Sequence, residues 1–98
     1  GPVGVGADGA IAVTIREPGA PSAGIAVLAP EATTVSRLDP PEAFDDRWPA
    51  FSPDGNTILI GRTFATRPDE ADGIWAVDLA TETVLQLTTD GTYARWLP

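Results

Sequence analysis

The sequence predicts an all-β fold of four-stranded antiparallel sheets, and three observations support this. Ten glycines and ten prolines among 98 residues indicate many turns. No stretch repeats its apolar residues with the period of a helix, and the prolines oppose one. The two halves of the chain also carry similar motifs in the same order, which is typical of a repeat protein.

Four short motifs recur at separations of roughly 46 to 49 residues, the length of one blade of a β-propeller. The matching pairs are Asp8-Gly9 with Asp54-Gly55, Gly24–Leu28 with Gly73–Val77, Val35–Leu38 with Val84–Leu87, and Arg47–Pro49 with Arg95–Pro98. We therefore divide the chain into a first, degraded blade-like repeat (1–46), a second blade (47–91) and the first strand of a following blade (92–98).

Strands within each repeat follow from local composition. In the Asp-Gly turns, the aspartate accepts backbone hydrogen bonds and the glycine takes the positive-φ position, which predicts hairpins rather than binding sites. The predicted strands are Val3–Val5, Ile11–Ile15, Ile25–Leu28, Thr34–Leu38, Ala50–Phe51, Thr57–Ile60, Ile74–Leu79 and Val84–Thr88, with a ninth beginning near Tyr93. Ile11–Ile15 and Ile58–Ile60 are apolar at consecutive positions, so both faces of these sheets are expected to be covered.

Composition excludes several classes of function. Without histidine or cysteine, the chain cannot supply Ser-His or Cys-His catalysis or a histidine-ligated zinc site. The net charge of −8 and the scattered arginines argue against nucleic acid as a partner. No apolar run has the length of a membrane span, and none resembles a signal peptide. Because the chain opens with Gly1-Pro2 and no Met, we expect it to be processed or excised from a longer protein.

The segment Trp48–Gly55 (WPAFSPDG) resembles the signature of TolB-like propellers, bacterial relatives of the WD repeats. Gly73–Leu79 is similar to the third strand of such a blade, and Gln86–Thr88 to the end of its fourth strand. The first half departs from the pattern, because Gly6–Gly9 replaces Ser-Pro-Asp-Gly and Ala29 stands where the second half has an aspartate. The resemblance implies a partial propeller, and therefore blades that need neighbours.

This resemblance implies a non-catalytic scaffold that binds protein or peptide partners in the bacterial cell envelope, in the periplasm or outside the cell. The alternative is a fragment of the substrate-gating propeller of a prolyl-oligopeptidase-like serine peptidase, whose catalytic domain would lie elsewhere. In either case we assign no catalytic residue, cofactor or metal to this chain and expect no enzyme activity from it. Two blades leave two sheet faces uncovered, so we expect self-association or packing against further blades.

Two polar segments are predicted as loops. Arg67–Gly73 carries Asp69, Glu70 and Asp72, whose oxygens suit calcium, although the spacing is not that of an EF-hand and an acidic surface loop is preferred. Pro40–Asp46 is predicted as a connection between blades exposed to solvent, with a partner contact as the alternative. No spacing places two carboxylates opposite each other for glycoside hydrolysis.

The aromatic and basic residues favour structural roles. Trp48, Trp75 and Trp96 are predicted to pack between blades rather than to stack on a sugar or a peptide. Arg47 and Arg95 precede equivalent tryptophans and are expected to pair with Asp46, Asp78 or a neighbouring blade.

Overall fold

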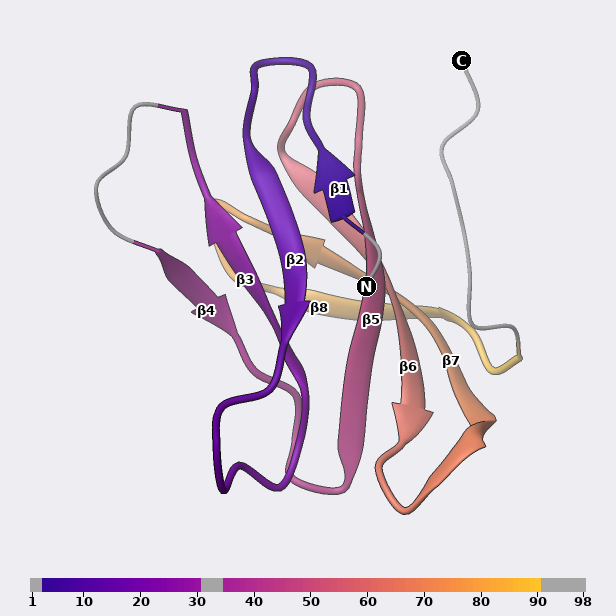
Figure 1. Cartoon of the computed structure of the whole chain (residues 1–98). Coiled ribbons are helices and arrows are strands. Elements are labelled where there is room, and N and C mark those ends of the chain that lie inside the picture. Colours follow the sequence, from indigo (N-terminus) through magenta and orange to yellow (C-terminus); the bar gives the residue numbers. More distant parts are fainter. Residues whose placement is uncertain (1–2, 31–34, 91–98) are drawn as a thin grey trace.

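The computed structural model describes residues 3–30 and 35–90, which form two four-stranded antiparallel sheets and no helix (Figure 1). The all-β prediction is confirmed for this part of the chain. In each sheet every strand lies beside the next one in sequence, so both sheets are simple meanders. The first contains β1 (Val3–Val5), β2 (Ile11–Ile15), β3 (Gly24–Leu28) and β4 (Ser36–Leu38), and the second β5 (Phe44–Phe51), β6 (Thr57–Phe64), β7 (Arg67–Asp78) and β8 (Val84–Thr88).

The second sheet is longer than predicted, and this corrects both loop predictions. Phe44–Asp46 belongs to β5, and Arg67–Gly73 belongs to β7. Both segments pair with the end of β6, where Phe64 lies opposite Phe44 on one side and Arg67 on the other. The paired positions are Phe44–Asp46 on one side of β6 and Arg67, Ala71 and Gly73 on the other, with register shifts between these last three. This pairing gives the backbone groups hydrogen-bond partners, so the sheet outweighs the low strand propensity of the polar residues. The predicted strand start at Thr34 and the predicted strand near Tyr93 lie outside the described residues.

The two Asp-Gly turns are hairpin turns, as predicted. The Ala10 N–H donates to Asp8 Oδ1 at 3.0 Å, and the Asn56 N–H donates to Asp54 Oδ1 at 2.9 Å. Gly9 and Gly55 follow with φ of 93° and 75°, a region that favours glycine. The equivalent turns of the two halves therefore use the same local chemistry.

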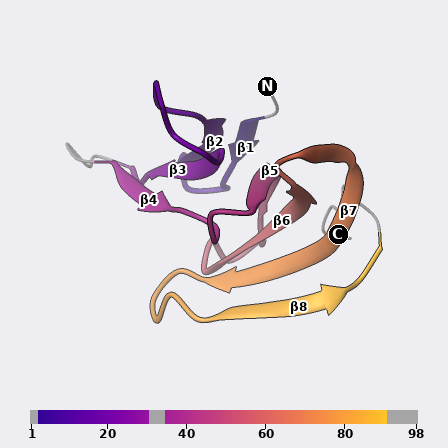
Figure 2. The same ribbon diagram turned by 90° about the horizontal axis from the view of Figure 1, so that it is seen from below.

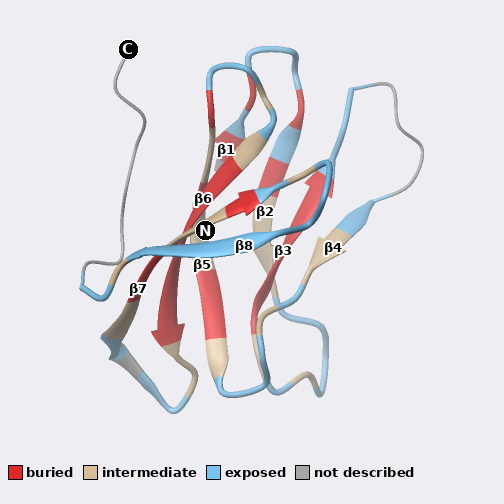
Figure 3. Ribbon diagram, turned by 180° about the vertical axis from the view of Figure 1, so that it is seen from behind, coloured by how far each residue is buried: buried red, intermediate tan, exposed pale blue. Residues whose placement is uncertain are grey.

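The hydrophobic core lies between the two sheets, and Figure 3 shows buried segments on the strands that contribute to it. Alternate residues of a strand share a face, so each sheet turns one apolar face toward the other. The buried side chains are Ala12, Ile25 and Val27 of the first sheet and Ile58, Ile60 and Val77 of the second. Leu38, Phe51, Trp75 and Leu79 pack against them.

The first strand of the second sheet, β5, lies between the first sheet and β6 (Figure 2). A bulge between Arg47 and Ala50 interrupts its pairing with β6, and Trp48 within the bulge has a φ of 53°. Here the Pro49 carbonyl approaches β1 so closely that a Cβ on Gly4 would lie 2.5 Å from its oxygen. The bulge is therefore one point where the backbones of the two sheets come close together.

Candidate functional site

Two consecutive aspartates of β5, Asp45 and Asp46, are almost fully buried at the junction of the two sheets. An ionised carboxylate is costly to bury unless cations and hydrogen-bond donors surround it. The two side chains point to opposite faces of the strand, as consecutive strand residues do. Each has its own set of partners, and we call these two sets together the junction cluster: Asp45 with Arg16 and Arg47, and Asp46 with Arg62.

Within the second sheet, Asp46 binds Arg62 of β6 in a two-pronged ion pair. The Arg62 Nε donates to Asp46 Oδ1 at 2.8 Å and its Nη2 to Oδ2 at 3.2 Å. The guanidinium carbon also lies 4.5 Å from the centroid of the Trp75 ring and 5.7 Å from that of Phe44. Burial raises the pKa of Asp46 above its ordinary value, although the hydrogen bonds and charge of Arg62 oppose this.

Between the sheets, Asp45 is held by the loop that connects β2 to β3. It accepts the Ala23 N–H at 2.8 Å and the Arg16 Nη2 at 3.0 and 3.1 Å, and Arg47 Nη2 lies 3.2 Å from Oδ2. The Asp46 N–H donates in turn to the Ala23 carbonyl at 3.0 Å. The side chains of Arg16 and Arg47 are 45% and 35% exposed, so this half of the junction cluster is open to solvent.

These contacts correct two predictions. Asp45 and Asp46 are buried structural carboxylates and not part of a solvated connection. Arg47 forms its ion pair with Asp45, two residues away, and not with Asp46 or Asp78, because residues at i and i+2 lie on the same face of a strand. Arg95 lies outside the described residues.

Three of the hollows that the described residues border lie between loops or between the two sheets. One of about 450 Å³ is bounded by the β2–β3 and β4–β5 loops, and one of about 430 Å³ by the β4–β5 and β6–β7 loops. Pro21 and Glu42 border both of these. The third, about 210 Å³, opens between the sheets and is bordered by Asp46, Arg62 and Arg37. Arg37 is neutralised by two carboxylates there, Glu17 and Asp39 at 2.5 and 2.8 Å.

The residues considered for calcium do not converge on a site. Asp69, Glu70 and Asp72 lie on β7, where Glu70 pairs with Arg67 at 2.9 Å. Asp72 accepts a hydrogen bond from the Trp75 indole at 3.0 Å. Over residues 3–30 and 35–90, no group of three or more acidic side chains is placed to hold a metal ion.

The tryptophans lie in different surroundings. Trp75 packs against the core and stacks on Arg62, whereas Trp48 lies in the β5 bulge and is partly exposed. Trp96 lies outside the described residues. Trp75 thus packs against the core between the two sheets, and its predicted place between propeller blades stays a prediction.

The ion pairs of Asp45 with Arg16 and Arg47 were not predicted from the sequence. It was also not predicted that Arg62 is the partner of Asp46. A signal was present, because Asp45-Asp46-Arg47 stands between Phe44 and Trp48, and Arg62 lies two residues after the apolar run Ile58–Ile60. Charges inside an otherwise apolar strand pattern indicate buried ion pairs.

Neither a family model, nor a curated protein, nor a solved structure matches the chain. In the part of the chain that the structure describes, no helix could cross a membrane.

Proposed function

We propose that the chain is a non-catalytic β-propeller scaffold whose two sheets are blades and whose partners are proteins or peptides. Two stacked meanders of four strands, with a core between them, support this proposal. The resemblance of Trp48–Gly55 to the signature of TolB-like propellers also supports it and extends the proposal to a role in the cell envelope.

The observation that carries the proposal is the apolar character of the two outer faces. On the first sheet, Val5, Ile11 and Leu28 form one cross-strand row, and all three are exposed, Val5 to 68%. On the second sheet, Leu85 and Leu87 of β8 are 63% and 53% exposed. Figure 3 shows β8 as an exposed strand along most of its length. Side chains of this kind favour burial against a neighbour.

Further sheets of the same kind fit these faces best. The two outer faces differ in sequence, so contact between them is head-to-tail and generates a ring or an open chain of subunits. Closed propellers have about four to eight blades, so about two to four copies of a two-bladed chain would complete a ring. Blades from a longer parent chain would cover the same faces.

Sedimentation across micromolar concentrations tests the proposal. We expect assemblies larger than the 10.2 kDa monomer, and we expect the double variant Leu85→Thr/Leu87→Thr to shift them toward monomer. Val84→Thr is the matched control, because Val84 is 45% exposed on the same strand but lies on the opposite face from Leu85 and Leu87.

A monomer that binds a hydrophobic dye through Leu85 and Leu87 would support coverage by other blades of a longer chain. A stable monomer that binds no dye at any of these concentrations would contradict the proposal. Equal loss of assembly in Val84→Thr would also contradict it, because the effect would not belong to the outer faces.

A further inference from the structure

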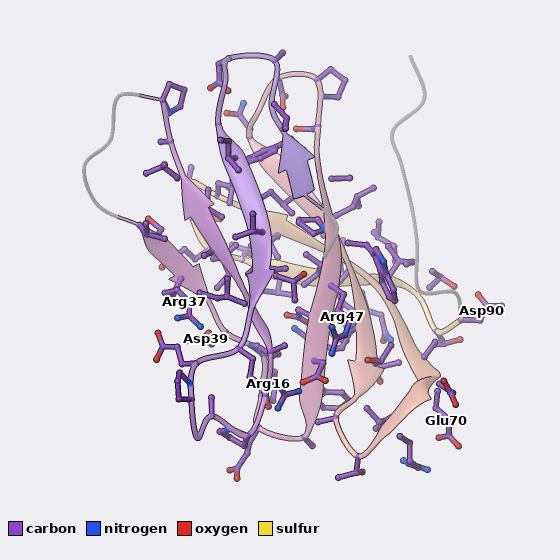
Figure 4. All side chains as sticks on the ribbon, viewed as in Figure 1. Arg16, Arg37, Asp39, Arg47, Glu70 and Asp90 are labelled. Atoms are coloured by element: carbon purple, nitrogen blue, oxygen red, sulfur yellow. The ribbon has the colours of Figure 1, made fainter. Side chains whose placement is uncertain are left out.

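We propose that Arg16 and Arg47 form a binding site for a single carboxylate group of a peptide or protein partner. Both guanidinium groups converge on the buried carboxylate of Asp45, within 3.0 and 3.2 Å of its Oδ2. Figure 4 shows the two arginines on the same side of the molecule, Arg47 on β5 and Arg16 at the end of β2. Arg47 lies on β5, at the opposite edge of the second sheet from Leu85 and Leu87 of β8, so the site goes beyond the scaffold role proposed above.

The hydrogen-bond donors of the two arginines exceed what Asp45 can accept. Asp45 already receives the Ala23 N–H and both guanidinium groups. Arg47 uses its Nη2, and its Nε and Nη1 make no hydrogen bond within the described residues. Since a guanidinium group has five N–H donors in a planar fork, Arg47 keeps an edge that can bind an incoming carboxylate.

Charge points to the same two residues. Two guanidinium groups share one carboxylate here, which leaves a local charge of about +1 on a chain with a net charge of −8. The other described arginines are each matched by at least one acid: Arg62 by Asp46, Arg67 by Glu70, and Arg37 by both Glu17 and Asp39. Within the part of the chain that the structure describes, the excess of cation over anion therefore lies at Arg16 and Arg47.

The local charge of about +1 at Arg16 and Arg47 favours a ligand with a single negative charge. One excess positive charge balances a monoanion, whereas a phosphate dianion or a nucleic acid would meet the repulsion of the surrounding acidic surface. A carboxylate also matches the planar geometry of arginine. Asp45 holds both side chains near their bound positions, which lowers the entropy lost on binding.

The test is an NMR titration that follows the Arg16 and Arg47 Nε–Hε signals. The probe is N-acetyl-dialanine with a free carboxylate, and its C-terminal amide is the uncharged control. We expect saturable shifts at millimolar probe for the free acid and none for the amide. Arg47→Gln should weaken binding at least tenfold, whereas Arg67→Gln, which removes an arginine paired on β7, should leave it unchanged.

Equal shifts with the acid and the amide would overturn the proposal, as would equal loss in Arg67→Gln. Stronger binding of inorganic phosphate than of the peptide acid would overturn the choice of ligand. If Arg47→Gln does not fold, Arg47→Lys is the variant to measure. It keeps the positive charge but loses the planar guanidinium group, so the peptide acid should bind more weakly and still better than the amide. The mass measurement above does not depend on these residues, so the two proposals fail separately.

Discussion

At the scale of single residues, buried charge is the main constraint on this protein. Asp46 and Arg62 are both buried, and each neutralises the other. Replacing such a pair with apolar residues is often tolerated, whereas removing one partner leaves an uncompensated charge in the interior. The charge of each of these two side chains is therefore stabilised mainly by the other side chain and not by solvent.

We predict that Arg62→Met destabilises the protein by about 3–5 kcal/mol, because it leaves the Asp46 carboxylate buried without its cation. The double variant Arg62→Met/Asp46→Leu should recover most of this loss, because it removes both charges. Urea unfolding at neutral pH measures both variants. A double variant that is less stable than the single one would show that the charge of Asp46 is compensated in another way.

Two aspartates should affect the pH dependence of stability in opposite directions. Burial raises the pKa of Asp46 above 3.8, so the folded state holds its proton more tightly than the unfolded chain does. The contribution of Asp46 is therefore greatest below about pH 3.8 and falls as the pH rises through the raised folded value. Hydrogen bonds from Ser52 and Asn56 lower the pKa of Asp54. Its contribution is present above about pH 3.8 and is lost as the pH falls through the lowered folded value.

The measurement is the free energy of unfolding against pH for the wild type, Asp46→Asn and Asp54→Asn. The wild-type stability relative to Asp46→Asn should fall with rising pH, and relative to Asp54→Asn it should rise. Each variant serves as the control for the other, because both lose one carboxylate. If both stability differences change with pH in the same direction, the pKa values of Asp46 and Asp54 are not shifted in opposite directions, and the prediction is wrong.

At the scale of secondary-structure elements, the edge of the second sheet depends on one glycine. Gly73 of β7 has a φ of 131°, and a Cβ at this position would collide with the carbonyl oxygen of Thr88 on β8. The pairing of β7 with β8 also shifts register between Ile74 and Trp75, directly after this residue. The close approach of the backbones at Gly73 thus positions β8, which carries the apolar outer residues.

We predict that Gly73→Ala destabilises the protein by about 3 kcal/mol and increases hydrogen exchange in β8 first, since the strands must separate to admit the methyl group. Gly9→Ala is the control, because Gly9 also has positive φ but no atom lies within 4 Å of the added Cβ. It should cost about 1 kcal/mol, the backbone term alone. Equal losses of stability in Gly73→Ala and Gly9→Ala would show that the close approach of Thr88 to Gly73 does not add to the cost.

At the scale of the whole molecule, the two sheets should unfold as one unit. Ile25 of the first sheet and Ile58 of the second are fully buried in the same core. Asp45 and the Asp46 N–H add polar contacts from β5 to Ala23 in the loop before β3. Neither sheet buries its apolar face without the other, which is the condition for a single cooperative transition.

We predict that Ile58→Ala lowers stability by about 2–5 kcal/mol and reduces hydrogen-exchange protection in both sheets to a similar extent. Thr66→Ala, in the exposed β6–β7 turn, should change stability by less than about 0.5 kcal/mol. Loss of protection confined to the second sheet would show that the sheets are stable independently of each other.

The candidate site was much less accessible to sequence reasoning than the strands. Arg16 lies 29 residues from Asp45, and Arg62 lies 16 residues from Asp46. No local pattern links residues at such separations, because their contact depends on how the sheets stack. The extra strand residues Phe44–Asp46 and Arg67–Gly73 were missed for a related reason, since pairing with β6 and not their own composition makes them extended.

By itself, the sequence determined the all-β class, the strand centres and the Asp-Gly hairpins, because apolar runs and turn residues act over a few neighbouring positions. Tertiary structure alone decided which aspartates are buried, which arginines neutralise them, and where two guanidinium groups share one acid. Those outcomes depend on desolvation and on contacts between sheets, and both arise only when distant segments pack together.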